Sequence, residues 1–333
     1  MDPFTHVVVS IAAGRAGLNK LSPLATPMLV ISGVAPDLDL LTALAGPRAF
    51  LLGHRTATHS VFGIAAIAFL TAVCFTVLRR KHDSSPIRFF PALAICTMGA
   101  TLHVLFDLTN SYGVKLLWPF SGKWHAWDLL LQFDWIILFV LAAGILLPML
   151  FRLVSEEIGA QRKTKGVVSA AITIALVFVY VGARYVSHDR AITLMTSRLY
   201  NGAAPLAVGA FPDSLSPFHW AGVITTETTL LRVGVPVANG AYDPFSAQLL
   251  YKPQETAALE AARRSGTATL FLSFARFPRA SVEQTDHGFH VEISDMRFEI
   301  GEPPGRSMKV VIDLDGRAQI LNETLKFGDL FQR

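Results

Sequence analysis

The sequence predicts an α-helical membrane domain that crosses the bilayer several times, followed by a small α+β extracytoplasmic domain. Hydrophobic residues make up 52% of the 333 residues and charged residues only 16%, whereas a soluble globular domain carries about 25% charge. Long apolar stretches are confined to residues 1–187, and beyond them charges of both signs are interspersed. We therefore expect a transmembrane helical domain at 1–187 and a soluble α+β domain at 188–333.

Four stretches are long and apolar enough to cross a bilayer, which requires ~20 mostly apolar residues. They lie at 60–78, 89–108, 129–151 and 166–187. Two shorter apolar segments precede them, at 4–18 and 24–44, and the sequence PDLD at 36–39 interrupts the second. The start of the chain lacks the basic region of a cleavable signal peptide, so we expect it to stay in the protein.

The basic residues between these segments predict the orientation in the membrane. They gather in alternate loops: Arg15, Lys20, Arg79, Arg80, Lys81, Arg88, Arg152, Arg162, Lys163 and Lys165. Short loops rich in Lys and Arg stay on the cytoplasmic side. We therefore expect an inner-membrane, multi-pass protein whose C-terminal domain is periplasmic or extracellular. The net charge of +4 is small and scattered, so we expect no nucleic-acid partner.

The C-terminal domain shows short runs of alternating hydrophobicity, which are typical of strands. They lie at 206–211, within 220–235, and at 267–277, 288–300, 308–314 and 317–324, with a helical segment at 254–265. Asp315-Gly316 predicts a hairpin turn between the last two strands. His287 and His290 flank a turn and are expected to be surface residues.

Ionisable residues within or beside the apolar segments are the main functional signal, because such groups are costly at membrane depth and usually functional. They are His6, Asp37, Asp39, His54, His59, His103, Asp107 and Asp134. The predicted orientation brings all of them to the outer half of the membrane. His103 and Asp107 are four residues apart and therefore share one helix face. Imidazole and carboxylate groups together indicate a divalent metal site, with zinc first and manganese or iron possible, and with one or two ions per chain.

Several motifs carry a resemblance to a known family. They are TH at 5–6, PDLD at 36–39, HRTATHS at 54–60, HVLFDLTNSYG at 103–113 and PFS at 119–121, with SPFHW at 216–220, FARFP at 274–278 and DMRFEI at 295–300 in the tail. In order and spacing this set is similar to the YdjM/YbcI-type membrane-bound metal-dependent hydrolases. The resemblance implies a metal-dependent hydrolase with these ligands: His6, Asp37, Asp39, His59, His103 and Asp107. His54 and Arg55 match the His-Arg pair of its loop motif.

The expected reaction is metal-assisted hydrolysis of an amphipathic substrate, with phosphoester lipids as the leading class. His54 or a carboxylate, Asp134 being the candidate, would accept the proton, and Arg55 would hold an anionic group with its planar guanidinium. The sequence contains no HExxH, GxSxG or P-loop motif, which argues against other common enzyme sites. Two alternatives stay open: a non-catalytic metal-binding transporter, and a regulatory scaffold in which the metal joins helices.

Overall fold

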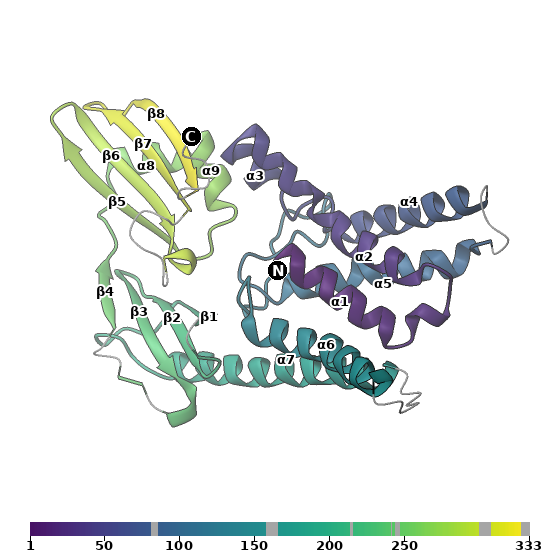
Figure 1. The fold of residues 1–333 in the computed structure, drawn as a ribbon. Helices are drawn as coiled ribbons and strands as arrows, with labels where there is room; N and C mark the ends of the chain where they lie inside the picture. The colour runs from purple at the N-terminus through teal and green to yellow at the C-terminus, as the bar shows by residue number, and fades with distance from the viewer. Residues whose placement is uncertain are drawn as a thin grey trace. The chain divides into compact units, whose positions relative to one another are not determined.

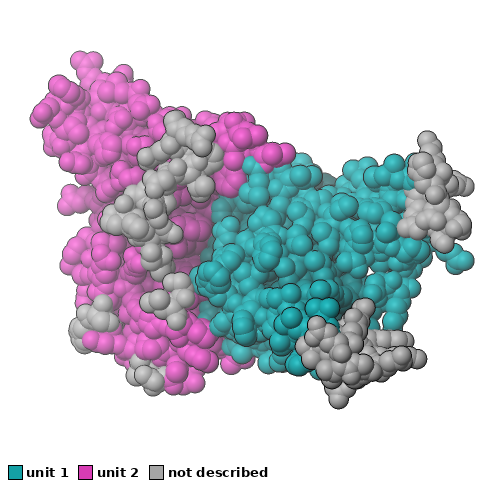
Figure 2. All heavy atoms as spheres, in the orientation of Figure 1, with its two compact units in different colours: residues 1–40, 53–185 teal, residues 41–52, 186–333 magenta. Residues whose placement is uncertain are grey.

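The computed structural model describes residues 1–80, 86–157, 166–213, 216–240, 242–243, 247–299 and 308–327. Contacts divide the chain into two compact units, shown in teal and magenta in Figure 2. The first unit comprises residues 1–40 and 53–185, and the second comprises residues 41–52 and 186–333. The short segment 41–52 thus belongs with the C-terminal part of the chain, although it lies between two segments of the first unit.

The first unit is built from helices (Figure 1). They are α1 (Pro3–Arg15), α2 (Ala25–Val34), a 3-10 helix (Ala35–Ala45) that continues α2, α4 (Val61–Arg80), α5 (Phe89–Leu108), α6 (Trp135–Glu157) and α7 (Val167–Thr196). Four helical stretches are long and apolar enough to cross a membrane: Ala25–Ala45, Val61–Leu78, Phe89–Leu108 and Val167–Thr196. The predicted helical membrane region is therefore confirmed, but its members differ: Ala25–Ala45, expected to be a shorter segment, qualifies, whereas the apolar helix Trp135–Phe151 within the predicted span 129–151 is shorter.

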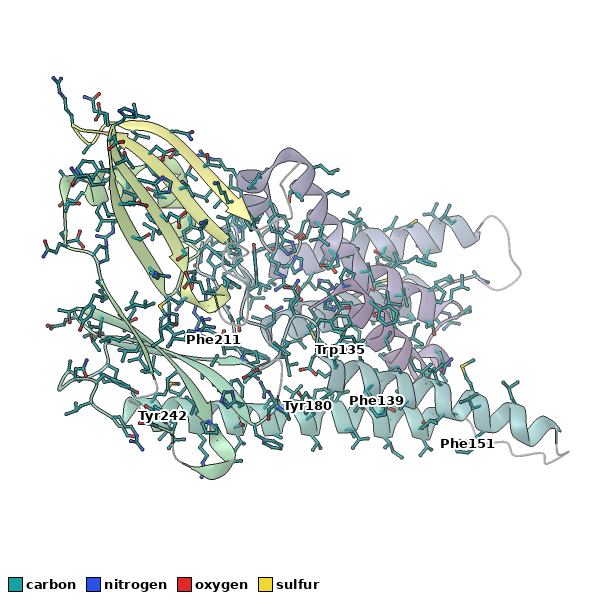
Figure 3. All side chains as sticks on the ribbon, turned by 60° about the vertical axis from the view of Figure 1, so that its left-hand side comes forward. Trp135, Phe139, Phe151, Tyr180, Phe211 and Tyr242 are labelled. Carbon is teal, nitrogen blue, oxygen red and sulfur yellow. The ribbon has the colours of Figure 1, made fainter. Side chains whose placement is uncertain are left out.

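The segment 129–151 differs from the prediction at its beginning. The amides of Leu129 and Leu130 bond to the carbonyl of Thr109 instead of continuing a helix. α6 begins only at Trp135, where the Asp134 carboxylate accepts from the amides of Ile136 and Ile137 at 3.1 Å and so caps the helix. Trp135, Phe139 and Phe151 then follow one another along α6 with their rings exposed (Figure 3). An apolar helix with outward-facing aromatic rings suits a lipid environment.

Helices α1, α2 and α5 approach one another closely because small residues lie where they cross. A β-carbon at Gly99 would collide with Ser32 Oγ and lie 2.7 Å from the Leu29 carbonyl, and one at Gly33 would collide with Ser10 Oγ. Small residues let membrane helices bring their backbones together. This packing brings the end of α2 against the middle of α5.

The second unit contains two four-stranded antiparallel sheets. The first, in the order β1-β2-β3-β4, comprises Ala207–Pro212, His219–Thr225, Thr229–Pro236 and Gln248–Tyr251. The second, in the order β5-β6-β7-β8, comprises Pro278–Thr285, Gly288–Asp295, Met308–Asp315 and Ile320–Phe327. Helices α8 (Ala257–Arg264) and α9 (Gly266–Leu272) connect the sheets in sequence. The α+β class is therefore confirmed.

Two local predictions in this unit were wrong. Residues 267–277 were expected to form a strand, but α9 occupies their first half, because the Ser265 side chain caps the helix at the amide of Ala268. Thr267 and Phe271 then lie one turn apart on its buried face. The sequence does not predict strand β5, because most of its side chains are exposed and polar. The strand pairs with β6 but has no apolar face that would indicate it.

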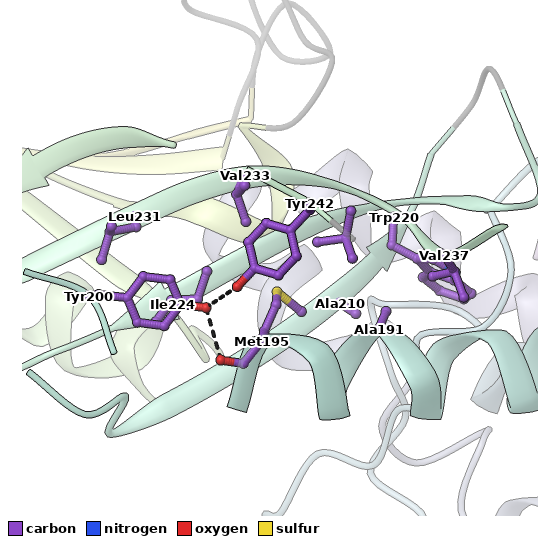
Figure 4. Close-up of a cluster of buried hydrophobic side chains, with 11 residues drawn as sticks. Ala191, Met195, Tyr200, Ala210, Trp220, Ile224, Leu231, Val233, Val237 and Tyr242 are labelled. Carbon is purple, nitrogen blue, oxygen red and sulfur yellow. Dashed lines mark hydrogen bonds between the residues drawn. The ribbon is translucent and has the colours of Figure 1, made fainter. Parts of the chain in front are cut away.

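The end of α7 forms part of the core of the first sheet (Figure 4). Ala191 and Met195 are fully buried against Trp220 and its neighbours. The Tyr200 hydroxyl donates to the Met195 carbonyl at 2.9 Å and contacts the hydroxyl of Tyr242. The helix passes without a break through the predicted domain boundary at 187.

Helix α3 (Pro47–Gly53) also belongs to the second unit. The rings of Phe50 and Phe327 meet edge to face with centroids 5.3 Å apart. A β-carbon at Gly266 would lie 3.8 Å from both Arg48 Nη2 and Glu323 Oε1, so α3, α9 and β8 meet at this point. The chain continues from α3 directly into His54 and Arg55.

Candidate metal centre

Four of the predicted site residues converge in the first unit. One ligand atom from each of Asp37, His59, His103 and Asp107 lies within 4.8 Å of the others, and all four side chains are buried. His59 Nε2 lies 3.0 Å from Asp107 Oδ2 and 4.0 Å from Asp37 Oδ1. His103 Nε2 lies 3.5 Å and 3.6 Å from the same two oxygens. This group of four side chains, here called the Asp/His group, could hold a metal ion.

Three separate segments supply the Asp/His group. Asp37 sits in the 3-10 helix directly after Pro36, and His59 ends the loop 53–60 before α4. His103 and Asp107 lie one turn apart on α5, as their spacing predicts. The close crossing of α2 and α5 at Gly99 is what brings the first and third segments together.

The hydrogen bonds behind the two imidazoles fix which nitrogen carries the proton. His103 Nδ1 lies 2.7 Å from the Gly33 carbonyl, and His59 Nδ1 lies 3.1 Å from Asp39 Oδ2. Both partners are acceptors, so each Nδ1 is the donor and each Nε2 carries a lone pair. The two Nε2 atoms nevertheless lie only 3.0 Å apart. The two Nε2 atoms and the carboxylate oxygens of Asp37 and Asp107 therefore face one another as four acceptors, with no hydrogen atom between them.

This arrangement fits a tetrahedral divalent metal. Zinc binds imidazole nitrogen and carboxylate oxygen at about 2.0–2.2 Å, which places ligand atoms about 3.3 Å apart. The five separations that involve an imidazole nitrogen, 3.0–4.0 Å, bracket that spacing. A cation between the four atoms would also relieve the repulsion between their lone pairs. The donor set suits zinc, iron or manganese.

Asp39, predicted as a ligand, lies beside the Asp/His group and orients its neighbours. Its Oδ2 accepts from Thr58 Oγ1 at 2.6 Å and from His59 Nδ1 at 3.1 Å. Its Oδ1 lies 2.7 Å from His54 Nδ1. One carboxylate therefore positions two histidines, which is the usual partnership behind a metal-binding imidazole.

His6, also predicted as a ligand, stacks on His103 with ring centroids 3.8 Å apart. Its Nε2 lies 3.3 Å from Asp107 Oδ1. The Met1 nitrogen contacts the same oxygen. His6 is thus adjacent to the Asp/His group through the other oxygen of Asp107, and its role as a ligand of a second ion stays a prediction.

Arg55 is buried beside the Asp/His group, with only 1% of its surface exposed. Its Nη2 donates to Asp107 Oδ1 at 3.0 Å and its Nη1 donates to Asn110 Oδ1 at 3.0 Å. The backbone is left-handed here, with φ +57°, which is uncommon for a residue with a side chain. Bonds from Arg55 N to Asp39 and from Lys115 N to the Arg55 carbonyl hold it in this conformation.

The loop 53–60 keeps its histidines neutral. Burial lowers the pKa of His59 to about 4, although Asp39 opposes the shift. Burial also lowers the pKa of His54. Arg55 stays protonated at neutral pH, because burial lowers its pKa only to about 10. Neutral imidazoles are the form that binds metals or accepts protons.

Asp134, predicted as catalytic, caps α6 and accepts from the Tyr180 hydroxyl of α7 at 3.2 Å. It is not a member of the Asp/His group. Three contributors were missed by sequence reasoning: Thr58, the Gly33 carbonyl and Asn110. Asn110 stands in the run TNSYG after Asp107, whereas a backbone carbonyl such as that of Gly33 cannot be recognised from residue types.

The part of the chain that carries this site is similar to known proteins. A family model described as YdjM inner membrane protein matches residues 1–191. The chain is also 26% identical over 310 residues to a Bacillus subtilis (strain 168) protein named "Uncharacterized protein YfhP", covering 90% of this chain and 87% of that protein. No solved structure matches the chain. The matched residues 1–191 include the whole Asp/His group.

Proposed function

This chain belongs to the YdjM inner membrane protein family, and from that membership and the Asp/His group we propose that it is an integral membrane metal-dependent hydrolase. The observation that carries the proposal is the convergence of four buried acceptor atoms from Asp37, His59, His103 and Asp107. A structure without a cation there would leave these lone pairs facing one another. When bound, a divalent metal supplies Lewis acidity and makes water a stronger acid at neutral pH.

The residues around the group supply the remaining functions of a hydrolase. His54 is held by Asp39 through Nδ1, so its Nε2 is the accepting nitrogen and can take a proton, as in other oriented His–carboxylate pairs. Arg55 is cationic and planar, and it can hold an anionic group of the substrate. Asp39 orients both His54 and His59. One metal per chain is the simplest proposal for the four-residue group.

An amphipathic substrate suits the surroundings of the site. Trp118, Phe120 and Trp127 are exposed in the loop that follows Asn110, and exposed aromatic residues mark the membrane–water boundary. An apolar cavity of about 200 Å³ lies between α1, α5, α6 and α7, with Leu105 and Phe106 in its wall. We propose a phosphoester lipid, with the site and the C-terminal domain on the outer face as the loop charges predict.

The deciding measurement is the metal content of the full chain purified in detergent without chelator. We expect about one equivalent of a transition metal in the wild type and its loss in the double variant His103→Ala, Asp107→Ala. The matched control is His290→Ala, Asp313→Ala, which removes a histidine–carboxylate pair at 2.7 Å on the second sheet. The loaded protein is then assayed on phosphoester lipids. A metal-free wild type would contradict the proposal.

A second function is favoured by one observation. Every side chain of the Asp/His group is buried, as expected for a structural metal that joins the 3-10 helix, the loop 53–60 and α5. Metal removal would then unfold the first unit, and the loaded protein would hydrolyse none of the lipids tested. Turnover by the loaded protein would exclude this alternative.

A further inference from the structure

Two buried hydrogen-bond donors beside the Asp/His group lack a partner among the described residues. They are Arg55 Nε and Asn110 Nδ2. Arg55 is 1% exposed and Asn110 is 2% exposed. Leaving a buried donor unpaired costs about 1–3 kcal/mol, and more for a charged group. Two such donors in contact side chains therefore indicate a ligand that supplies oxygen acceptors.

Hydrogen bonds fix the direction of the Asn110 amide. Its Oδ1 accepts from Arg55 Nη1 at 3.0 Å and from the amide of Tyr112 at 2.8 Å. Because both partners are donors, the oxygen must be on that side and the NH₂ group on the other. The two protons of Nδ2 are thus held in one direction by the rest of the loop.

The guanidinium of Arg55 is fixed in the same way. Nη1 bonds to Asn110 and Nη2 bonds to Asp107 Oδ1. In a planar guanidinium, the Nε–H lies on the same edge as one Nη2–H. The unpaired Nε–H is therefore on the side of the guanidinium that carries Nη2, the nitrogen that donates to Asp107, whose other oxygen belongs to the Asp/His group.

Asn110 lies close to the ligands in the chain as well as in space. It follows Asp107 by three residues, and its backbone N–H donates to the Asp107 carbonyl at 3.3 Å. The Arg55 guanidinium also contacts both side chains, Asp107 through Nη2 and Asn110 through Nη1. The Asn110 side-chain amide therefore belongs to the same turn of the chain as the ligand Asp107.

We propose that Arg55 Nε–H and the Asn110 side-chain amide form an oxyanion site that binds the phosphoryl oxygens of the substrate next to the Asp/His group. The inference rests on the proposed hydrolase function and adds Asn110 as a substrate-binding residue. A phosphoryl group suits the site because it offers several anionic oxygens to a cationic, forked donor. A neutral carboxylic ester carries no negative charge to match the cationic guanidinium.

The test is calorimetric titration of the full chain in detergent with two probes, inorganic phosphate and dihexanoyl phosphatidic acid. The informative variant is Asn110→Asp, because aspartate keeps the Oδ1 acceptor for Arg55 and Tyr112 and replaces the NH₂ donor with a charged oxygen. We expect both probes to bind at least roughly tenfold more weakly. The control is Asn201→Asp, which makes the same change of charge in an exposed turn and should leave the affinity unchanged.

Metal content is measured on each sample, so the two proposals are tested separately. Unchanged affinity in Asn110→Asp, or a wild type that binds neither probe, overturns the oxyanion site even if the metal is present. A wild type without metal overturns the hydrolase function instead. If Asn110→Asp loses its metal, Arg55→Lys replaces it as the test, because lysine keeps the charge and lacks the Nε–H edge. Tighter binding of the lipid probe assigns a lipid headgroup, and equal binding assigns free phosphate.

Discussion

Asp39 Oδ2 lies 3.1 Å from His59 Nδ1, on the opposite side of the imidazole ring from the Asp/His group. The carboxylate therefore determines that His59 presents a lone pair, and not a proton, to the other three ligand atoms. Since Asp39 also contacts His54 and the amide of Arg55, one side chain organises the whole loop 53–60.

Asp39→Asn should weaken metal binding about 10–100-fold, as is typical when the partner of a metal-binding histidine is lost. The amide keeps the size of the side chain but can present a donor to His59 Nδ1 and favour the wrong tautomer. Affinity can be measured by competition with a chelator. Asp313→Asn, at the half-buried pair with His290 in the second unit, is the control. Equal metal affinity in both variants would show that Asp39 does not orient a ligand.

Asp134→Asn should leave metal content and any hydrolase activity unchanged, because asparagine caps a helix about as well as aspartate does. Asp134→Ala should lower the free energy of unfolding by about 0.5–2 kcal/mol, since it removes the acceptor for the amides of Ile136 and Ile137. Thermal unfolding and the lipid assay separate the two effects. Loss of activity with retained stability in Asp134→Asn would instead establish a catalytic carboxylate.

Gly99→Ala should destabilise the first unit by about 1–3 kcal/mol, the usual cost of overpacking. Its methyl group would lie 2.7 Å from the Leu29 carbonyl and push α2 away from α5. The bond from His103 Nδ1 to Gly33 would lengthen, so metal affinity should fall together with stability.

The matched control is Gly182→Ala, because a β-carbon at Gly182 in α7 meets nothing within 4 Å. Alanine is the better helix former by about 1 kcal/mol, so this variant should be as stable as the wild type or more stable. A Gly99→Ala protein that unfolds at the wild-type temperature and keeps its metal would refute the role of the close crossing.

Glu323→Gln should lower the melting temperature of the second unit at pH 7 by a few degrees. Burial raises the pKa of Glu323, but hydrogen bonds from Thr267 and Ser265 and the charge of Arg48 outweigh it and lower the pKa below its usual value. A carboxylate with a lowered pKa stabilises the fold above its unfolded pKa, and this contribution is lost as the pH falls through the folded value.

The difference between wild type and Glu323→Gln should therefore shrink below about pH 4. Melting curves at pH 7 and at pH 3 measure it, with the exposed Glu283→Gln of β5 as the control. A difference of the same size at both values would mean that the ionised form of Glu323 contributes nothing.

The helical membrane region could be predicted from the sequence because ~20 consecutive apolar residues leave few alternatives. The soluble unit was harder where local signals compete. Residues 267–277 alternate like a strand, yet the cap at Ser265 starts a helix there. Strand β5 exposes most of its side chains and is stabilised by pairing with β6, which depends on residues distant in sequence.

In the candidate site, too, contacts between distant segments could not be predicted from the sequence. The loop charges predict that the imidazoles and carboxylates lie at one depth, and the structure brings Asp37, His59, His103 and Asp107 together. Depth alone does not say which oxygen faces which nitrogen. That His6 stacks on His103 depends on how α1 packs against α5. That Asp39 orients His54 and His59 depends on contacts between the 3-10 helix and the loop 53–60, which are distant from each other in sequence.

Segment 41–52 has a consequence for how the protein is made. It is synthesised early, between Asp39 and His54, yet Phe50 packs on Phe327 near the end of the described chain. During translation this segment must wait for almost the entire remaining polypeptide before it meets its neighbours in the second unit. A ribosome-bound chain that ends after α7 would therefore already contain the site residues on both sides of segment 41–52. The segment itself would not yet have its neighbours in the second unit.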